Sequence, residues 1–128
     1  MTIIKFPSKQ VNTPFFKDVL DEGYHIYSLE DAKLKDYYPN KFPDYPGVLL
    51  KDLNVGDVIT IRVFVKIGTG KNVRIDGGYV DLEVEHIDEQ SVFGVIMTAL
   101  PDKFPLKKGE SLEIFQEEIL YKSNETEH

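Results

Sequence analysis

The stretch that decides the fold runs from Tyr79 to Leu100 and reads YVDLEVEHIDEQSVFGVIMTAL. In its first part apolar and acidic residues alternate with a period of two, which puts the apolar side chains on one face of a strand and the carboxylates on the other. The apolar residues are Val80, Leu82 and Val84, and the acidic ones are Asp81, Glu83 and Glu85. A polar turn at residues 88–90 follows, and then a second apolar run that Gly94 interrupts. The pattern predicts an antiparallel hairpin with one face in a core.

The longest alternation in the chain lies upstream, in residues 59–67. Branched aliphatic residues occupy every second position there, namely Ile59, Ile61, Val63, Val65 and Ile67. This face is predicted to be core, and the opposite face carries Thr60, Arg62, Phe64 and Lys66. If the second face lies beside the acids of residues 81–85, Arg62 and Lys66 would pair with those carboxylates across the strands.

The turn before this strand has a counterpart near the C-terminus. Residues 53–61 and 106–114 share the pattern Leu-x-x-Gly-acid-x-apolar-x-apolar. In each turn the leucine is predicted to be anchored in the core, the glycine to take a backbone conformation that other residues resist, and the acid to begin a strand. We interpret the match as recurring turn chemistry of small barrels related to the SH3 fold, not as duplication.

Shorter elements are predicted around this sheet. They are an edge strand or a loose terminus within residues 1–12, a helix at about 14–22, a brief strand within 24–29, a short strand at 48–50 and a glycine-rich hairpin connection at 68–78 that turns at Asp76-Gly77. Residues 122–128 are expected to fray. The connection is no phosphate loop, because Asn72 follows Lys71 where such a loop needs Ser or Thr.

Together the elements predict a mostly β fold and one domain over residues 1–128: a five- or six-stranded antiparallel, SH3-like, partly open barrel with one short N-terminal helix. A chain of 128 residues, 41% hydrophobic and 29% charged, has the size and composition of a single globular domain. The absence of Cys excludes a disulfide framework and a thiolate metal site. No apolar run approaches the roughly 20 residues of a membrane span, so we expect no membrane contact and a cytoplasmic protein.

An ordered set of features in the second half resembles one known family. The features are the strand at 63–66, a glycine-rich gap, Tyr79 before the alternating strand, the turn at Asp88, Gly94, Pro101, the Leu-Lys-Lys-Gly-Glu turn at 106–110 and Ile119. In this order residues 57–121 resemble the YegJ-like domains, small bacterial domains with no established activity. The chain departs from the family at Tyr79, where Trp is usual, and at Leu120-Tyr121, where the family closes with an Asp-Trp pair. The resemblance implies a bacterial protein and a fold, and it implies no chemistry.

Acidic side chains are the first candidate for a function. The formal net charge is -7, and 22 acidic residues stand against 15 basic ones, which argues against a surface that binds nucleic acid through its phosphates. Asp81, Glu83 and Glu85 share one strand face. They form either a solvated face relieved by a neighbouring strand or, extended by Asp88 and Glu89, a patch that engages a basic protein.

The proline-rich loop at residues 36–47 is the second candidate. Three prolines and a glycine exclude regular structure over most of it, and its aromatic residues are Tyr37, Tyr38, Phe42 and Tyr45. The loop either packs these rings onto the barrel or serves in recognition, because Tyr supplies rigid, amphipathic contact area.

The sequence offers no catalytic constellation, cofactor motif or metal site. His25, His86 and His128 have no His or Cys at metal-ligand spacing nearby. His86 is in phase with the apolar residues of its strand, so it is predicted to be a partly buried histidine on the opposite face from Glu85.

Two functional hypotheses follow, and an enzyme is a distant third. The first is a non-enzymatic interaction module, inhibitor-like or immunity-like, that binds a basic protein through Asp81, Glu83 and Glu85. The alternative is a barrel that binds a small ligand or single-stranded nucleic acid through the four aromatic residues of the loop, with Lys71 and Arg74.

Overall fold

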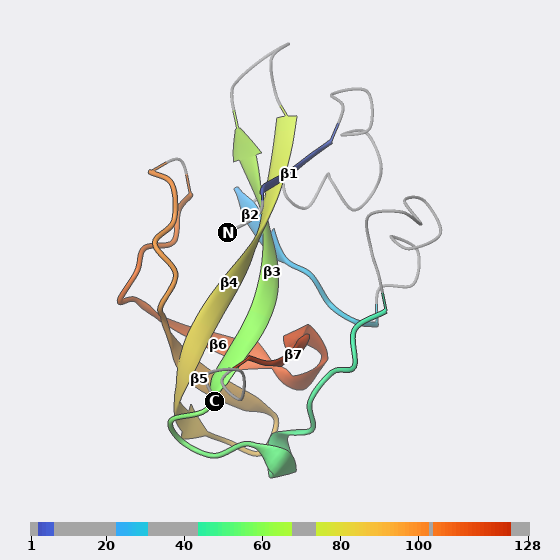
Figure 1. The fold of residues 1–128 in the computed structure, drawn as a ribbon, viewed down its shortest axis with the longest axis vertical. Helices are drawn as coiled ribbons and strands as arrows, with labels where there is room; N and C mark the ends of the chain where they lie inside the picture. The colour runs from blue at the N-terminus through green and yellow to red at the C-terminus, as the bar shows by residue number, and fades with distance from the viewer. Residues whose placement is uncertain (1–2, 7–22, 31–43, 68–73, 103, 124–128) are drawn as a thin grey trace.

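A computed structural model of the chain describes residues 3–6, 23–30, 44–67, 74–102 and 104–123 (Figure 1). Its strands form one antiparallel sheet and are β1 Ile3–Phe6, β2 Tyr24–Ile26, β3 Val58–Ile67, β4 Arg74–Ile87, β5 Ser91–Ile96, β6 Ser111–Phe115 and β7 Tyr121–Lys122. The described residues also include two short 3-10 helices, η2 Leu50–Asp52 and η4 Gln116–Glu118. The helix predicted at about 14–22 lies outside the described residues. No helix within the described ranges is long and apolar enough to cross a membrane.

The sheet runs in the order β2-β3-β4-β5-β6 and curls into a half-barrel. Figure 1 shows the long, twisted β3–β4 hairpin, with β5, β6 and β7 gathered around its lower half. β7 pairs with β3 at residues 59–60, beside the place where β2 pairs with it at residues 63–65. β1 pairs with β4 at residues 75–78. A meander β3-β4-β5-β6 that returns through a 3-10 turn to β3 is the arrangement of an SH3-like barrel, so the predicted mostly β, partly open barrel is confirmed.

The number of strands is larger than predicted. The described residues contribute seven strands to the sheet, not five or six. The difference arises at the two outer edges of the long β3–β4 hairpin, because each edge is longer than any one of the strands that pair with it. Two short strands therefore pair with one edge of β3, and both β1 and β5 pair with one edge of β4.

The core lies on the inner face of the curled sheet. The aliphatic face of β3 is buried, as predicted, at Ile59, Ile61, Val63 and Val65. Apolar side chains from the next three strands and from the segment before β7 complete it, including Val80, Leu82, Val84, Val92, Ile96, Ile114 and Ile119. Gly94 pairs normally within β5, and a Cβ there would lie 2.9 Å from the Cβ of Leu82. The glycine therefore permits a close approach of β5 to β4.

The two similar turns have the same backbone geometry, so that prediction is confirmed. Gly56 and Gly109 have positive φ angles of 98° and 94°, which residues with a Cβ rarely adopt. The leucine that opens each turn is buried. The acid that closes each turn, Asp57 or Glu110, accepts a hydrogen bond from the backbone N–H three residues earlier, at 2.8 and 2.6 Å.

Two predictions of local structure are wrong. Residues 48–50 form no strand, because the backbone N–H of Leu50 donates to Oε1 of Gln116 at 2.9 Å and the chain then enters η2. Asp76 and Gly77 form no turn, because they pair with Val65 and Phe64 inside the β3–β4 ladder. β4 therefore begins at Arg74, earlier than the glycine-rich composition suggested.

Candidate interaction surfaces

The predicted acidic residues of β4 lie on the outer face of the sheet but in different surroundings. Asp81 is half-buried and accepts a hydrogen bond from Oγ1 of Thr60 at 2.7 Å. Glu83 and Glu85 are exposed, and Oγ of Ser111 donates to Oε1 of Glu85 at 3.2 Å. Asp81 is thus tied into the sheet, whereas the other two carboxylates face solvent.

The expected cationic partners of this strip are not beside it. The register places Thr60 opposite Asp81 and Val58 opposite Glu83, while Arg62 faces Tyr79. Lys66 pairs further along, with residue 75. Within the described residues no lysine, arginine or histidine forms an ion pair with the three acids. The idea that Arg62 and Lys66 relieve the strip is therefore wrong.

A β-bulge at Glu85 changes the alternation of β4. Val84 pairs with Gly94 and His86 with Phe93, so Glu85 is the extra residue. His86 therefore turns outward, its side chain is 64% exposed, and its Nε2 lies 2.8 Å from Oδ1 of Asp88. The prediction of a partly buried His86 opposite Glu85 is wrong, because the bulge leaves both residues exposed and brings the next residue onto the core.

The outer face of β4, β5 and β6 combines carboxylates with an apolar row. Cross-strand pairing places Val95 between Glu83 and Ser111, and Phe93 between His86 and Glu113. Phe93 and Val95 are half-buried, and Met97, the next outward residue of this row, is 43% exposed. We name as the β4–β6 face the residues Glu83, Glu85, Phe93, Val95, Met97 and Glu113.

The sequence contained a signal for the apolar row. A sheet with one solvated face normally alternates apolar and polar residues. Residues 92–97 are apolar or glycine at every position, Val92-Phe93-Gly94-Val95-Ile96-Met97. The run therefore supplies apolar side chains to both faces of β5. Glu113, on the neighbouring strand, was not among the predicted residues, and it accepts a hydrogen bond from Oγ of Ser91 at 2.8 Å.

Tyr45 of the proline-rich loop packs onto the outer face of β3. Nη1 of Arg62 donates to the Tyr45 hydroxyl at 3.2 Å, and the Tyr45 and Tyr79 hydroxyls are hydrogen-bonded. The Tyr45 ring also contacts Tyr27 and Tyr121, with centroids 6.1 and 6.5 Å away. Tyr45 thus follows the packing interpretation of the loop. Tyr37, Tyr38 and Phe42 lie outside the described residues.

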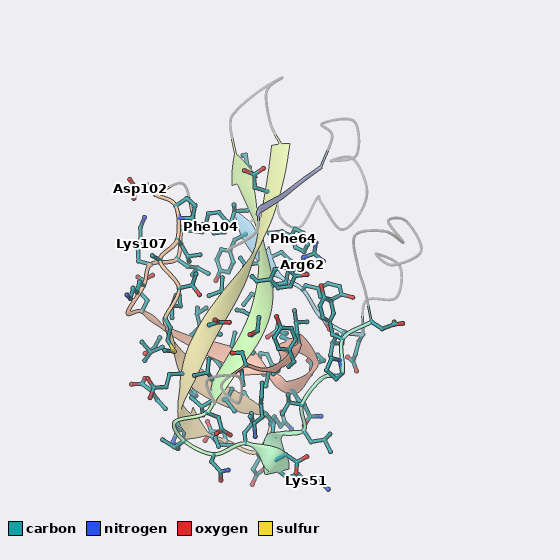
Figure 2. All side chains as sticks on the ribbon, viewed as in Figure 1. Lys51, Arg62, Phe64, Asp102, Phe104 and Lys107 are labelled. Carbon is teal, nitrogen blue, oxygen red and sulfur yellow. The ribbon has the colours of Figure 1, made fainter. Side chains whose placement is uncertain are left out.

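Arg62 is the centre of this covered region. Its side chain is 0% exposed, and its guanidinium carbon lies 5.1 Å from the Phe64 ring centroid and 5.3 Å from that of Tyr79. Figure 2 shows Arg62 and Phe64 beside each other on β3. Burial, and then the hydrogen bond with Tyr79, raise the pKa of the Tyr45 hydroxyl, and the Arg62 charge offsets this in part. We call Tyr27, Tyr45, Arg62, Phe64, Tyr79 and Tyr121 the tyrosine–arginine cluster.

A groove of about 670 Å³ lies between residues 46–49 and the segment from η4 to β7. Its lining includes Leu29, Val48, Leu49, Asp52, Glu117 and Tyr121. A smaller hollow of about 330 Å³ also borders η4, and Glu89 and Phe115 line part of it. The sequence predicted neither hollow, because each combines side chains from separate parts of the chain.

The histidines do not lie in these hollows, since His25 and His86 line neither of them. In the part of the chain that the structure describes, no group of three or more His, Cys, Asp or Glu side chains could hold a metal ion. The groove and the β4–β6 face are thus the candidate sites that the geometry offers.

No protein-family model, no curated protein and no solved structure matches the chain. The resemblance of residues 57–121 to the YegJ-like domains therefore stays a prediction. Function has to be argued from the surfaces described above.

Proposed function

We propose that this chain is a non-enzymatic interaction module that binds a basic protein through the β4–β6 face. The observation that carries the proposal is the apolar row of β5 lying between carboxylates on both neighbouring strands. Glu83 stands on one side of the row and Glu113 on the other, and Glu85 extends from β4 across β5 to Ser111 of β6.

This combination suits a partner with basic residues around an apolar centre. Burial of the row would supply affinity, at about 25 cal/mol per Å² of apolar surface removed from water. The surrounding carboxylates would select basic partners and speed encounter, and the net charge of -7 acts in the same direction. The backbone of the paired strands also needs little rearrangement on binding. Among interaction modules, an inhibitor or immunity-like protein fits these properties best.

The groove favours the alternative, a barrel that binds a small ligand. Its volume of about 670 Å³ falls in the usual range of small-molecule sites. Single-stranded nucleic acid is a poorer occupant, because Asp52 and Glu117 line the groove and would repel phosphates. We rank this alternative second, because Asp52, Glu117 and Lys122 give the groove more charged groups than a typical small-molecule site has.

The test compares partner capture by the wild type and by the double variant Glu83→Lys/Glu85→Lys. Asp81 is left unchanged because its carboxylate binds Thr60, so its replacement would also test folding. Proteins captured from a lysate of the source organism are identified, purified and titrated against each chain by calorimetry. We expect a basic partner whose affinity falls at least about tenfold in the double variant.

The control is Asp102→Lys, which reverses one charge at an exposed position outside this face. The control should bind as the wild type does at physiological salt. Equal affinity of the double variant and the wild type for every purified partner would contradict the proposal.

A further inference from the structure

The walls of the groove are fixed by hydrogen bonds between distant parts of the chain. The N–H of Gly47 donates to the carbonyl of Leu120 at 2.8 Å, and the N–H of Leu29 donates to the carbonyl of Glu117 at 2.6 Å. The N–H of Leu50 is bound by the side chain of Gln116. The extended segment at 46–49 is thereby held against η4 and β7, and the groove between them is preformed.

The lining has an apolar wall and a negative charge. Val48, Leu49 and Tyr121 supply the apolar part. Leu49 is a large hydrophobic residue, and it is nevertheless 49% exposed. Asp52 and Glu117 supply two carboxylates. The groove can therefore hold both the stem and the head of an amphipathic side chain.

The lysine that lines the groove is engaged by the chain itself. Nζ of Lys122 lies 3.4 Å from Oδ2 of Asp57, and it donates to the carbonyl of Asp52 at 3.4 Å. Its charge is thus shared with an acid at the start of β3. The carboxylates of Asp52 and Glu117 keep a net negative charge in the groove.

The pKa of the neighbouring Glu118 carboxyl is raised mainly by burial, and the charge of Glu117 makes a smaller contribution in the same direction. The hydrogen bond from the N–H of Phe115 lowers this pKa in part. A cation bound near Glu117 would relieve the repulsion between the two carboxylates.

From this lining, and resting on the proposed function, we infer that the groove receives an arginine or lysine side chain from an extended basic segment of the partner. Such side chains lay their methylene stem along apolar surface and keep the charged head among polar groups. Leu49 and Val48 would take the stem, the Tyr121 ring would lie close to the cation, and Glu117 and Asp52 would bind the head. At about 670 Å³ the groove is larger than one side chain, so it also accommodates adjacent residues of the segment.

The experiment uses the whole chain and a defined probe, the peptide Ac-Leu-Arg-Leu-Arg-Leu-NH₂. Its control replaces both arginines by citrulline, which has almost the same shape and no charge. Binding is followed by chemical shifts of the backbone amides in ¹⁵N-labelled protein. We expect the arginine peptide to shift the amides of Val48, Leu49 and Tyr121, and the citrulline peptide to bind much more weakly.

The variant Asp52→Asn/Glu117→Gln removes the two charges and keeps side-chain shape. We expect it to bind the arginine peptide about five- to tenfold more weakly than the wild type. Asp102→Asn removes one exposed charge outside the groove and serves as a control that should bind normally. Wild-type affinity in the double variant, equal binding of the citrulline peptide, or shifts confined to other surfaces would overturn the inference.

The β4–β6 face is tested beside the groove, so the two ideas can fail separately. If Glu83→Lys/Glu85→Lys loses the purified partner while Asp52→Asn/Glu117→Gln retains it, the groove inference is wrong and the proposed function stands. If only the groove variant loses the partner and the arginine peptide, the groove inference holds and the β4–β6 face is not the binding surface.

Discussion

The outer side of the sheet has two halves that differ in what covers them. Over β3 the chain's own segment at 44–47 lays Tyr45 against Arg62, and Arg62 and Phe64 are both fully buried. Over β4, β5 and β6 no described segment covers the outer face in this way, and Glu83, Glu85 and Met97 are exposed. The same side of one sheet is thus a second small core in one half and a candidate binding surface in the other.

The difference teaches how to interpret polar residues on a strand. Arg62 and Glu83 both belong to outward positions of an alternating strand, and the sequence pattern treats them alike. In the covered half the Arg62 guanidinium is part of the packing. It lies near the Phe64 and Tyr79 rings and donates to the Tyr45 hydroxyl. In the open half the Glu83 carboxylate is exposed, and a partner can reach it.

The largest expected effect separates the two halves by one matched pair of substitutions. Phe64 and Phe93 both point outward, but Phe64 is 0% exposed and Phe93 is only half-buried. We expect Phe64→Ala to lower the free energy of unfolding by about 3–5 kcal/mol. Phe93→Ala should cost about 1 kcal/mol, because less apolar area leaves the protein. Urea unfolding of both variants measures this, and equal losses would end the distinction between the halves.

A smaller effect is expected from Tyr45→Phe, which keeps the ring and removes the hydroxyl bound by Arg62 and Tyr79. The expected loss is about 1–2 kcal/mol at neutral pH. Because burial raises the pKa of this hydroxyl above its ordinary value of 10.0, it ionises more readily in the unfolded chain. The stability it contributes is therefore complete below pH 10 and is lost as the pH rises further.

Urea unfolding at several alkaline pH values tests this dependence. The wild type should lose stability more steeply than Tyr45→Phe as the pH rises past the ordinary pKa of tyrosine. Parallel curves would show that the Tyr45 hydroxyl does not titrate as a buried group, and they would weaken the description of the covered half as a core.

The smallest effect is expected in the open half. Glu83→Lys/Glu85→Lys should change the free energy of unfolding by no more than about 0.5 kcal/mol, because both side chains are exposed. Its sign should be stabilising at low salt, because lysines at these positions attract Asp81 on the same strand face, which the glutamates repel, and reduce the net negative charge of the chain. Thermal unfolding at low and high salt checks the sign. A large loss of stability would mean that the carboxylates serve the fold and not a partner.

Much of the fold could be predicted from local patterns. The alternation at 59–67 located β3 and its buried face, and the Leu-x-x-Gly-acid pattern anticipated two turns with the same hydrogen bonds. These features depend on neighbours within a few residues, which the sequence shows directly. The YegJ-like resemblance, the cytoplasmic location and the absence of catalysis stay predictions.

The surfaces were harder to predict because they depend on register and on distant contacts. Arg62 was expected beside the acids, and the ladder instead sets it opposite Tyr79. His86 was expected inside, and one extra residue turns it out. The groove is formed by segments about 70 residues apart that meet through a backbone hydrogen bond from Gly47 to Leu120. Alternation within one strand carries no information on any of these.

The bulge in β4 has a consequence for changes in chain length. Val84 pairs with Gly94 and His86 with Phe93, so Glu85 has no partner residue of its own on β5. A chain without Glu85 would still form both pairs, in uninterrupted register. The same deletion at Leu82 would turn the core side chains on one side of the gap toward solvent. β4 therefore has one position, Glu85, where deletion of a single residue keeps the register of the sheet.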